Sequence, residues 1–378
     1  DVVTGSELAN AGVVTTQTLN NAVPALFVSR SSGANTSFFI RGVGNFTNNA
    51  YSDPAVAFNY DNVYVARPTS TTTAFYDLER LEVLKGPQGT LYGRNATGGA
   101  INVIPVRPRL GEVAGYASAG YGSFKTLDLE AAINLPVGDN SAFRVSGKLV
   151  NGDGFNRDGT GDQEAAGVRA QFLTRISDDI RLRIGADYAY NGGMGVGPSY
   201  LGILRGTGGA PASATAPAGY TFVPEPSSLG PREGLHTDAA QAYHRTFLVS
   251  GSFNSPDGLD RPFLNNHQWG VNAELEIDTN VGSLTIIPAF RRTTLDLLFN
   301  GPGFKAGLNN ETDTQYSLEA RFEGKRVGPF DWLVGAFYFD ENIDADFTVS
   351  QFVTQAIQQF NTGTNSSATW NSAGREKW

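Results

Sequence analysis

From about Glu112 onward, apolar and polar residues alternate in a series of long segments. The clearest runs from Ile180 to Tyr190, where the apolar residues Ile180, Leu182, Ile184, Ala186, Tyr188 and Tyr190 share one parity, and Arg181, Arg183 and Asp187 the other. The same pattern recurs at 143–149, 168–176, 271–278 and 316–323. Because successive side chains of a strand point to opposite faces, each segment predicts a β-strand with one apolar and one polar face. The polar face, Arg183 included, is expected to line a wet interior.

Alternation alone fits both a soluble sandwich and a membrane barrel, so strand length and connection length decide between them. Many segments reach about ten residues, the length that crosses a bilayer at a tilt. Short turns are expected at 137–141, 177–179, 280–283 and 326–329, and long loops after Val150, Tyr190, Phe299 and Asp346. Short turns at one rim and long loops at the other are typical of a transmembrane barrel.

The same alternation of connections assigns residues 191–266 to one long extracellular loop with at most a local hairpin. It also gives about nine crossings, whereas bacterial single-chain barrels have even numbers. The crossings are expected near Glu112, Lys125, Ser141, Ala165, Ile180, Gln268, Leu284, Asp313 and Asp331. The tail from Asn361 to Trp378 lacks the alternating pattern, and we expect no strand there.

Residues 1–110 have a different texture and predict a small mixed α/β domain. A short helix capped near Ser6 is expected within Ser6–Leu19, and a second helix should end at Asn20–Pro24. Strands are expected at 26–29 and 38–41, and a hairpin over Val56–Val65. The hairpin should turn at Asp61-Asn62, because Asp and Asn tolerate the left-handed conformation. The proline of Arg107-Pro108-Arg109 marks the end of this domain, and residues 111–378 form the second unit.

A glycine-rich stretch from Asp77 to Asn102 reads DLERLEVLKGPQGTLYGRNATGGAIN. Its close glycines predict a strand, a set of tight turns and a second strand from Ala100 to Val106. A phosphate-binding loop is excluded, because no G-x-x-x-x-G-K-[ST] occurs. Without further information, the stretch would also fit an ordinary glycine-rich loop of any β-rich protein.

This stretch resembles the plug-domain signature of TonB-dependent outer-membrane receptors, through its acidic-apolar strand, K-G-P, Tyr-Gly and A-T-G-G-A-I-N. FFIRGVG (Phe38–Gly44) resembles the I-R-G strand of the same domain. The resemblance implies a mainly β fold, in which a small mixed α/β plug domain precedes antiparallel transmembrane β-barrel strands. Plugged barrels have about 22 strands, so we expect the barrel to be incomplete in this chain. The plug's first part, with the segment that TonB binds, should precede Asp1.

Composition and short motifs exclude several other classes of function. The chain has 378 residues, 45 glycines, no cysteine and a net charge of −9, which argues against a nucleic-acid partner. No apolar run approaches the roughly 18 residues that a membrane helix needs. His236, His244 and His267 lack the spacing of a zinc site, and no G-x-S-x-G elbow is present. We therefore predict no enzyme, no cofactor and no metal site.

Two groups of residues are candidates for function. Arg41 and Lys85 match the basic positions where, by the resemblance, the plug meets glutamates on the inner wall of the barrel; both could instead be solvated surface charges. Ligand contact is expected from two outward loops of the plug, whose candidate residues are Asn45, Phe46, Asn48, Asn49 and Tyr51 in one and Arg67, Phe75 and Tyr76 in the other. Neutral amides and aromatic rings suit sugars, aromatic chelates or other amphipathic ligands, but are also ordinary loop composition.

The resemblance implies TonB-dependent active uptake of a scarce ligand, such as a ferric siderophore or a saccharide, across the outer membrane of a Gram-negative bacterium. The implied partners are the TonB complex, outer-membrane lipid and a small-molecule or oligosaccharide ligand, with the receptor acting as a monomer. Two alternatives remain open. A passive porin would have a constricting loop in place of an N-terminal plug domain. A soluble β-rich adhesin or carbohydrate-binding module would not need the alternation of connection lengths.

Overall fold

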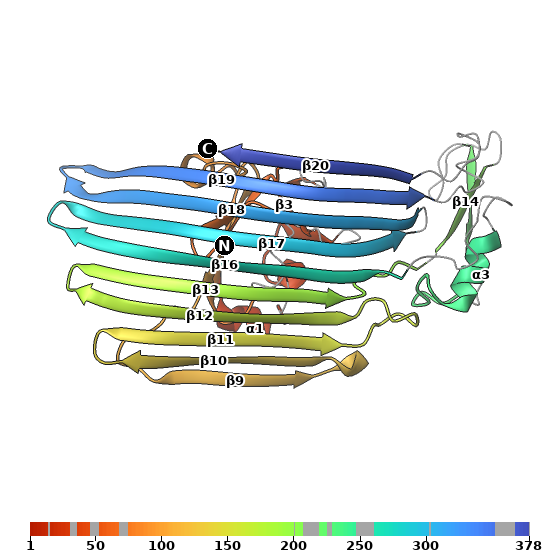
Figure 1. Ribbon diagram of the computed structural model, residues 1–378, viewed down its shortest axis with the longest axis horizontal. Coiled ribbons are helices and arrows are strands. Elements are labelled where there is room, and N and C mark those ends of the chain that lie inside the picture. The colour runs from red at the N-terminus through yellow and green to blue at the C-terminus, as the bar shows by residue number, and fades with distance from the viewer. Residues whose placement is uncertain are drawn as a thin grey trace.

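The structure, a computed structural model, describes residues 1–13, 16–30, 36–45, 53–67, 75–199, 201–206, 219–224, 229–246, 261–301, 304–351 and 367–377. An N-terminal domain of short elements lies against one face of a broad antiparallel sheet (Figure 1). The predicted fold class is confirmed, because strands dominate both parts and the helices are few and short.

The large sheet contains ten strands, and each pairs antiparallel with its neighbours in chain order. They are β9 (Ala114–Tyr121), β10 (Leu127–Val137), β11 (Ser141–Gly152), β12 (Gln163–Ser177), β13 (Ile180–Gly193), β16 (Phe263–Thr279), β17 (Gly282–Gly301), β18 (Phe304–Val327), β19 (Phe330–Gln351) and β20 (Ser367–Lys377). Among the described strands, β9 and β20 form the two edges of the sheet.

The connections between these strands follow the predicted alternation in most places. Four tight turns, at 138–140, 178–179, 280–281 and 328–329, lie at one end of the sheet, as expected. At the other end, residues 153–162 join β11 to β12 and residues 194–262 join β13 to β16. The second of these connections contains a hairpin of β14 (Gly202–Gly206) and β15 (Tyr220–Pro224), and a helix, α3 (Asp238–Thr246), that was not predicted. Figure 1 shows them beyond the ends of the long strands.

Two predictions about the sheet were wrong. The long loop expected after Phe299 is instead a continuation of both strands, with Phe299 opposite Gly307 in the register. Packing explains this difference, because Leu264, Leu295 and Leu297 form a buried cluster that supports the extension. The tail also forms a strand, β20, although its sequence does not alternate. Ladder hydrogen bonds come from the backbone, so the edge of β19 can pair with a polar segment.

The N-terminal domain contains two small sheets. One has the order β1-β7-β8-β5-β6 and the other β2-β3-β4. Their strands are β1 (Val2–Thr4), β2 (Leu26–Arg30), β3 (Thr36–Ile40), β4 (Val43–Gly44), β5 (Val56–Tyr60), β6 (Val63–Val65), β7 (Leu78–Lys85) and β8 (Gly99–Pro105). The domain core lies between the two sheets, where side chains such as Ile40, Leu81 and Ile101 are fully buried. None of the helices within the described residues is long and apolar enough to cross a membrane.

Two short helices are found in this region, as expected: a 3₁₀ helix at Thr16–Asn21, and α1 (Gly5–Asn10). Its N-cap is Thr4, not Ser6. The Thr4 hydroxyl accepts a hydrogen bond from the Glu7 amide, and the Glu7 carboxylate accepts one from the Thr4 amide at 2.8 Å. This reciprocal capping box satisfies backbone donors that a helix start leaves unpaired, and it places the helix directly after β1.

The predicted hairpin between β5 and β6 turns at Asp61-Asn62, with φ angles of 53° and 65°. The glycine-rich stretch forms β7, a single helical turn α2 (Gly89–Tyr92), and β8, which pairs antiparallel with β7. Both of these predictions are confirmed. The hairpin extends the domain toward the large sheet, and its tip supplies side chains to the interface described below.

Gly99 explains part of the glycine requirement of this stretch. Its φ is +147°, and a Cβ there would lie 2.2 Å from the Leu84 carbonyl oxygen. We expect Gly99→Ala to lower the free energy of unfolding by about 1–3 kcal/mol, the usual cost of such strain. A denaturant titration of the refolded protein measures this. Gly89→Ala is the control, because nothing lies within 4 Å of its Cβ position; equal losses in both variants would contradict the assignment.

Candidate functional site

The large sheet exposes its apolar residues and buries its polar ones, the reverse of a soluble protein. Phe143, Val145 and Ile184 are 45%, 43% and 46% exposed, whereas Arg144 and Arg183, at neighbouring positions of the same strands, are 6% and 2% exposed. Soluble proteins rarely expose contiguous apolar surface and almost never bury arginine without a partner. The apolar face therefore suits lipid, and the polar face is covered by the N-terminal domain.

Aromatic rings reinforce this assignment of the outer face. Trp269, Phe290 and Tyr316 form a row across β16, β17 and β18, with centroid distances of 4.9 Å for both pairs. Nearer the tight turns, Phe322 and Trp332 are 5.6 Å apart. Aromatic residues near the rims of an apolar band are typical of membrane barrels.

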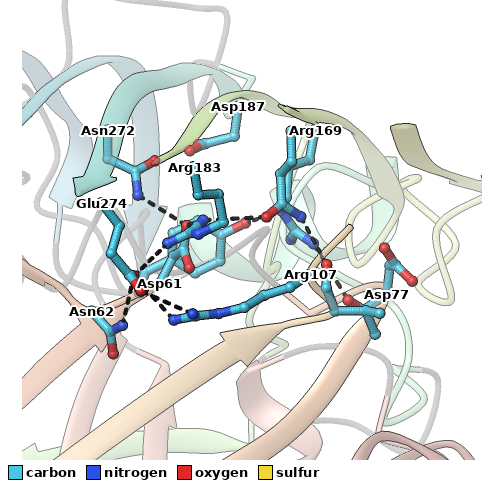
Figure 2. A network of polar contacts seen from close by, with 12 residues as sticks. Asp61, Asn62, Asp77, Arg107, Arg169, Arg183, Asp187, Asn272 and Glu274 are labelled. Atoms are coloured by element: carbon cyan, nitrogen blue, oxygen red, sulfur yellow. Dashed lines mark hydrogen bonds and ion pairs between the residues drawn. The ribbon is translucent and has the colours of Figure 1, made fainter. Parts of the chain in front are cut away.

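On the inner face, Arg183 of β13 is the centre of a buried cluster with Asp61, Asn272 and Glu274, called here the Arg183 cluster (Figure 2). Arg183 donates from Nη1 to Asp61 Oδ2 at 2.6 Å and from Nη2 to Glu274 Oε2 at 2.9 Å. Asn272 Nδ2 also donates to Asp61 Oδ2, at 2.9 Å. Asp61 is the tip of the β5–β6 hairpin, so this cluster joins the N-terminal domain to β13 and β16.

Glu274 receives two further contacts from the N-terminal domain. Arg107 donates to both of its oxygens, at 2.8 and 3.0 Å, and Asn62 Nδ2 lies 3.3 Å from Oε2. A bidentate guanidinium–carboxylate pair fixes orientation as well as distance. Figure 2 shows Arg107 and Asn62 reaching Glu274 from the side opposite Asn272. One carboxylate of the sheet thus contacts both the hairpin tip and the segment that leaves the domain.

Arg169 of β12 lies between two tyrosine rings of the N-terminal domain. Its guanidinium carbon is 5.3 Å from the ring centroid of Tyr60 and 4.5 Å from that of Tyr76, and Nε donates to the Tyr60 hydroxyl at 2.6 Å. Burial raises the pKa of Tyr60 well above its usual value and that of Tyr76 to about 12. Both phenols therefore stay neutral at physiological pH, and their rings stabilise the cation.

Asp77, which begins the glycine-rich stretch, is also held by the sheet. Its carboxylate accepts a hydrogen bond from Arg144 Nε at 2.8 Å, and its backbone amide donates to Glu130 Oε1 at 2.9 Å. Asp77 and Arg144 are both almost completely buried. These two contacts therefore hold the N-terminal domain against β10 and β11.

The fourth contact region lies across β18 and β19. Arg67 donates to both oxygens of Glu341, from Nε at 3.1 Å and from Nη2 at 2.6 Å. The Gln315 side chain accepts from the Ala66 amide at 3.2 Å and donates to the Tyr64 carbonyl at 2.6 Å. The end of β6 is therefore fixed to the sheet by a charged pair and by backbone contacts together.

This arrangement suits reversible seating of one domain against another. Replacing a buried ion pair by apolar residues is often neutral or stabilising, so such pairs add specificity rather than much net stability. Charged groups that separate into water regain hydration, whereas an apolar interface would expose hydrophobic surface. Among the described residues, no group of three or more potential ligands could hold a metal ion.

The structure places the two basic residues predicted from the motifs away from this interface. Lys85 lies 2.6 Å from the carboxylate of Asp1, within its own domain. Arg41 is exposed in the turn between β3 and β4 with φ of 53°. The kind of contact expected, a basic residue of the N-terminal domain with an inner-wall glutamate, is instead made by Arg107 with Glu274 and by Arg67 with Glu341. A barrel contact by Arg41 stays a prediction.

The residues predicted for ligand contact have different outcomes. Arg67, Phe75 and Tyr76 are buried: Arg67 holds Glu341, Phe75 packs in the domain core, and Tyr76 lies beneath Arg169. Their side chains are not open to a ligand in this structure, which corrects the prediction. Asn45 donates from Nδ2 to the Asp53 carbonyl at 3.0 Å. Phe46, Asn48, Asn49 and Tyr51 lie outside the described residues.

Sequence reasoning missed most of the interface, although one signal was present. The arginines at 144, 169 and 183 occupy the inward parity of three consecutive strands. A row of cations facing inward predicts a layer of carboxylates opposite them. The partners could not be assigned, because Asp61 and Arg183 are 122 positions apart in the chain.

The ion pair between Arg107 and Glu274 allows a direct test of whether such contacts hold the N-terminal domain against the large sheet. We expect Arg107→Gln to raise amide hydrogen exchange in the N-terminal domain, because glutamine cannot maintain the bidentate ion pair with Glu274. Arg41→Gln is the comparison variant, since Arg41 is exposed in a turn. Exchange measured by mass spectrometry should rise for Arg107→Gln alone. A larger effect from Arg41→Gln would instead support the contact predicted from the I-R-G motif.

A sheet with one apolar and one polar face, and a small domain seated on the polar face, is the arrangement expected of a plug against the inner wall of a membrane barrel. Residues 1–100 match the family model described as the TonB-dependent Receptor Plug Domain. This match assigns residues 1–100 to the plug domain that the sequence resemblance predicted. From here the N-terminal domain is called the plug.

Two individual receptors are similar to this chain in sequence. The chain is 30% identical over 190 residues to the pesticin receptor of Yersinia pestis, a match that covers 49% of this chain and 27% of that protein. It is 26% identical over 197 residues to the ferripyoverdine receptor of Pseudomonas aeruginosa, covering 52% and 23%. The aligned regions thus span about a quarter of these relatives' lengths.

Solved structures show the same fold. The ferric yersiniabactin uptake receptor FyuA of Yersinia pestis superposes with a TM-score of 0.69 at 17% identity, covering all of this chain and 60% of that chain. The siderophore receptor PiuA of Acinetobacter baumannii gives 0.68 at 15% identity, covering 100% and 52%. At these identities the likeness establishes the fold, a plug with adjoining barrel strands.

Proposed function

We propose that this protein is a TonB-dependent receptor that imports a ferric siderophore across the outer membrane. The observation that carries the proposal is the plug seated against the polar face of the barrel strands through the Arg183 cluster and its neighbours. A gate held by buried polar contacts can be displaced by force on the plug and then return. The TonB complex is the partner that would supply this force.

Siderophores are the favoured ligand class because of the relatives. Besides the two curated receptors above, a 72-residue region is 39% identical to the catecholate siderophore receptor Fiu of Escherichia coli. FyuA and PiuA are named for ferric yersiniabactin and a siderophore. A saccharide remains the alternative ligand, and the assay below distinguishes the two.

We further propose an orientation and a ligand side. The tight turns would face the periplasm, and the long connections, including residues 194–262, would face the outside. Ligand would contact the plug loop that contains Asn45, Phe46, Asn48, Asn49 and Tyr51. Outer-membrane lipid would surround the apolar face, and the full-length receptor would act as a monomer. The plug disfavours a passive porin, and the exposed apolar face disfavours a soluble adhesin.

The test is uptake by cells. The full-length receptor would be produced in a Gram-negative strain that lacks its own siderophore receptors, and radioactive iron would be supplied on purified siderophores of the catecholate and mixed-ligand classes. We expect uptake of at least one, dependent on both the receptor and TonB. Uptake that persists without TonB would indicate a porin. Binding of oligosaccharides, with no iron uptake from any siderophore, would move the receptor to the saccharide class.

A further inference from the structure

Arg169 is a buried cation whose partners are neutral while the plug is seated. It is 3% exposed, and it donates to the Tyr60 hydroxyl at 2.6 Å and to the backbone carbonyls of Tyr76 and Asp77 at 3.3 and 3.4 Å. None of the carboxylates in the described residues forms an ion pair with it. A buried charge without a counter-charge is costly. The other buried arginines of the interface, at 67, 144 and 183, each hold a carboxylate.

The same row of the sheet contains a second arginine. Asp187 lies opposite Arg169 in the register, Gly270 opposite Asp187, and Arg291 opposite Gly270; these four residues are called here the Arg169 row. Arg291 donates to both oxygens of Asp187, at 3.2 and 2.8 Å. A Cβ on Gly270 would lie 2.9 Å from Arg291 Nη1, so the glycine gives this side chain room to cross. The row therefore has two cations and one anion, and the anion is paired with Arg291.

The plug covers the excess charge with aromatic rings. The Tyr60 ring contacts both guanidiniums, with centroid distances of 5.3 Å to Arg169 and 5.2 Å to Arg291, and the Tyr76 ring centroid is 4.5 Å from Arg169. Gly167 of β12 makes room for the second ring, because a Cβ there would lie 2.8 Å from it. Ring faces stabilise cations but carry no net charge. Displacement of this part of the plug would therefore leave the row with a net positive charge facing the interior of the barrel.

We propose that the Arg169 row is an anion-binding site on the transport path. Tyr60 and Tyr76 cover it while the plug is seated, and an anionic group of the ferric siderophore binds there once this part of the plug has moved. This inference rests on the proposed function and adds a property of the ligand, its negative charge. A planar guanidinium binds carboxylate and catecholate oxygens with paired hydrogen bonds. Arg169 lies near the middle of β12, so the ligand would reach the site partway through the barrel.

The alternative is that the row only holds the plug. In that case Arg169→Gln and Tyr60→Leu should have the same effect, because each removes the same contact. The proposal separates them, since Tyr60→Leu loosens the plug but leaves both arginines in place. Asp187→Asn should act in the direction opposite to Arg169→Gln, because it raises the net charge of the row by one.

The experiment measures anion binding with the plug displaced. The full-length receptor would be placed in planar bilayers, with urea at a concentration that opens the barrel to ion current while its strands stay folded. The probe is the ferric complex of dihydroxybenzoate, an anionic catecholate chelate, and its block of the current gives a dissociation constant. Arg169→Gln should weaken the block about tenfold, the size of one charge-assisted hydrogen bond. Tyr60→Leu should leave the block unchanged, and Asp187→Asn should strengthen it several-fold.

Equal block of the parent and Arg169→Gln would overturn the proposal, and so would an equal loss of block in Tyr60→Leu and Arg169→Gln. If Arg169→Gln does not fold, Asp187→Asn decides, because a block no stronger than the parent's would contradict a cationic site. Uptake by cells adds a second readout. Arg169→Gln should lower the maximal rate of siderophore uptake and leave KM, which reflects binding at the outer face, unchanged. If the parent takes up no siderophore, the proposed function fails, while the block still decides whether the row binds anions.

Discussion

Replacing Arg183 by alanine should lower the free energy of unfolding by about 3–5 kcal/mol, the usual loss when one partner of a buried ion pair is removed. The sequence pattern alone suggested a tolerant position, since Arg183 was expected to face a wet interior. The structure corrects this, because the side chain is 2% exposed and holds both Asp61 and Glu274. Without Arg183, Asp61 keeps Asn272 as its remaining contact in the cluster.

Arg181 offers a matched control on the same strand. It shares the parity of Arg183 but lies next to the first residue of β13, its side chain is 52% exposed, and it lies 3.2 Å from Glu276. An exposed pair of this kind contributes about 0–1 kcal/mol, so Arg181→Ala should be nearly silent. Denaturant unfolding of the full-length receptor in micelles compares the two variants. Similar losses for both would mean that the Arg183 cluster does not hold the plug.

The second large effect concerns the lipid face. Val145 lies near the middle of β11 and is 43% exposed. On a soluble protein, an arginine at such a position would be accepted with little change. In a membrane barrel, Val145→Arg should cost about 2–4 kcal/mol, because the charge would enter the centre of the bilayer.

The control for Val145→Arg is Val137→Arg at the end of β10. Val137 is 53% exposed and adjoins a tight turn, so its side chain would lie near the interface, where the cost falls to about 0–1 kcal/mol. Refolding into lipid vesicles and titration with denaturant give both values. Two variants that each lose less than about 1 kcal/mol would be inconsistent with lipid around β11.

The strands and tight turns were predictable, because period-two alternation and short polar turns are local properties of the sequence. The β5–β6 turn is an example, since Asp61 and Asn62 both favour the left-handed conformation they adopt. These local properties did not predict the elements whose formation depends on pairing with neighbouring strands. The extension of β17 and β18 past Phe299 depends on a leucine cluster from β16 and β17. β20 forms by backbone pairing with β19, which does not require its sequence to alternate.

The interface was predictable in kind but not in detail. Family resemblance led to Arg41 and Lys85, whereas the basic plug residues paired with carboxylates of the sheet are Arg67 and Arg107. Arg67 and Glu341 are 274 positions apart, and no pattern in the sequence links residues at such a separation. The three ligand-contact candidates in the 67–76 region failed for a related reason, because an arginine or aromatic residue beside a loop serves equally well as an anchor.

One measurement tests the central claim, that the apolar face of the sheet is surrounded by lipid while the plug covers the polar face. The chain has no cysteine, so a single introduced cysteine carries one fluorescent probe. Val145 in β11 and Phe155 in the connection that follows are both 43% exposed. In vesicles, a probe at Val145→Cys should be quenched by brominated acyl chains and protected from aqueous iodide, and a probe at Phe155→Cys should show the reverse. Equal quenching of both probes by iodide would contradict the account.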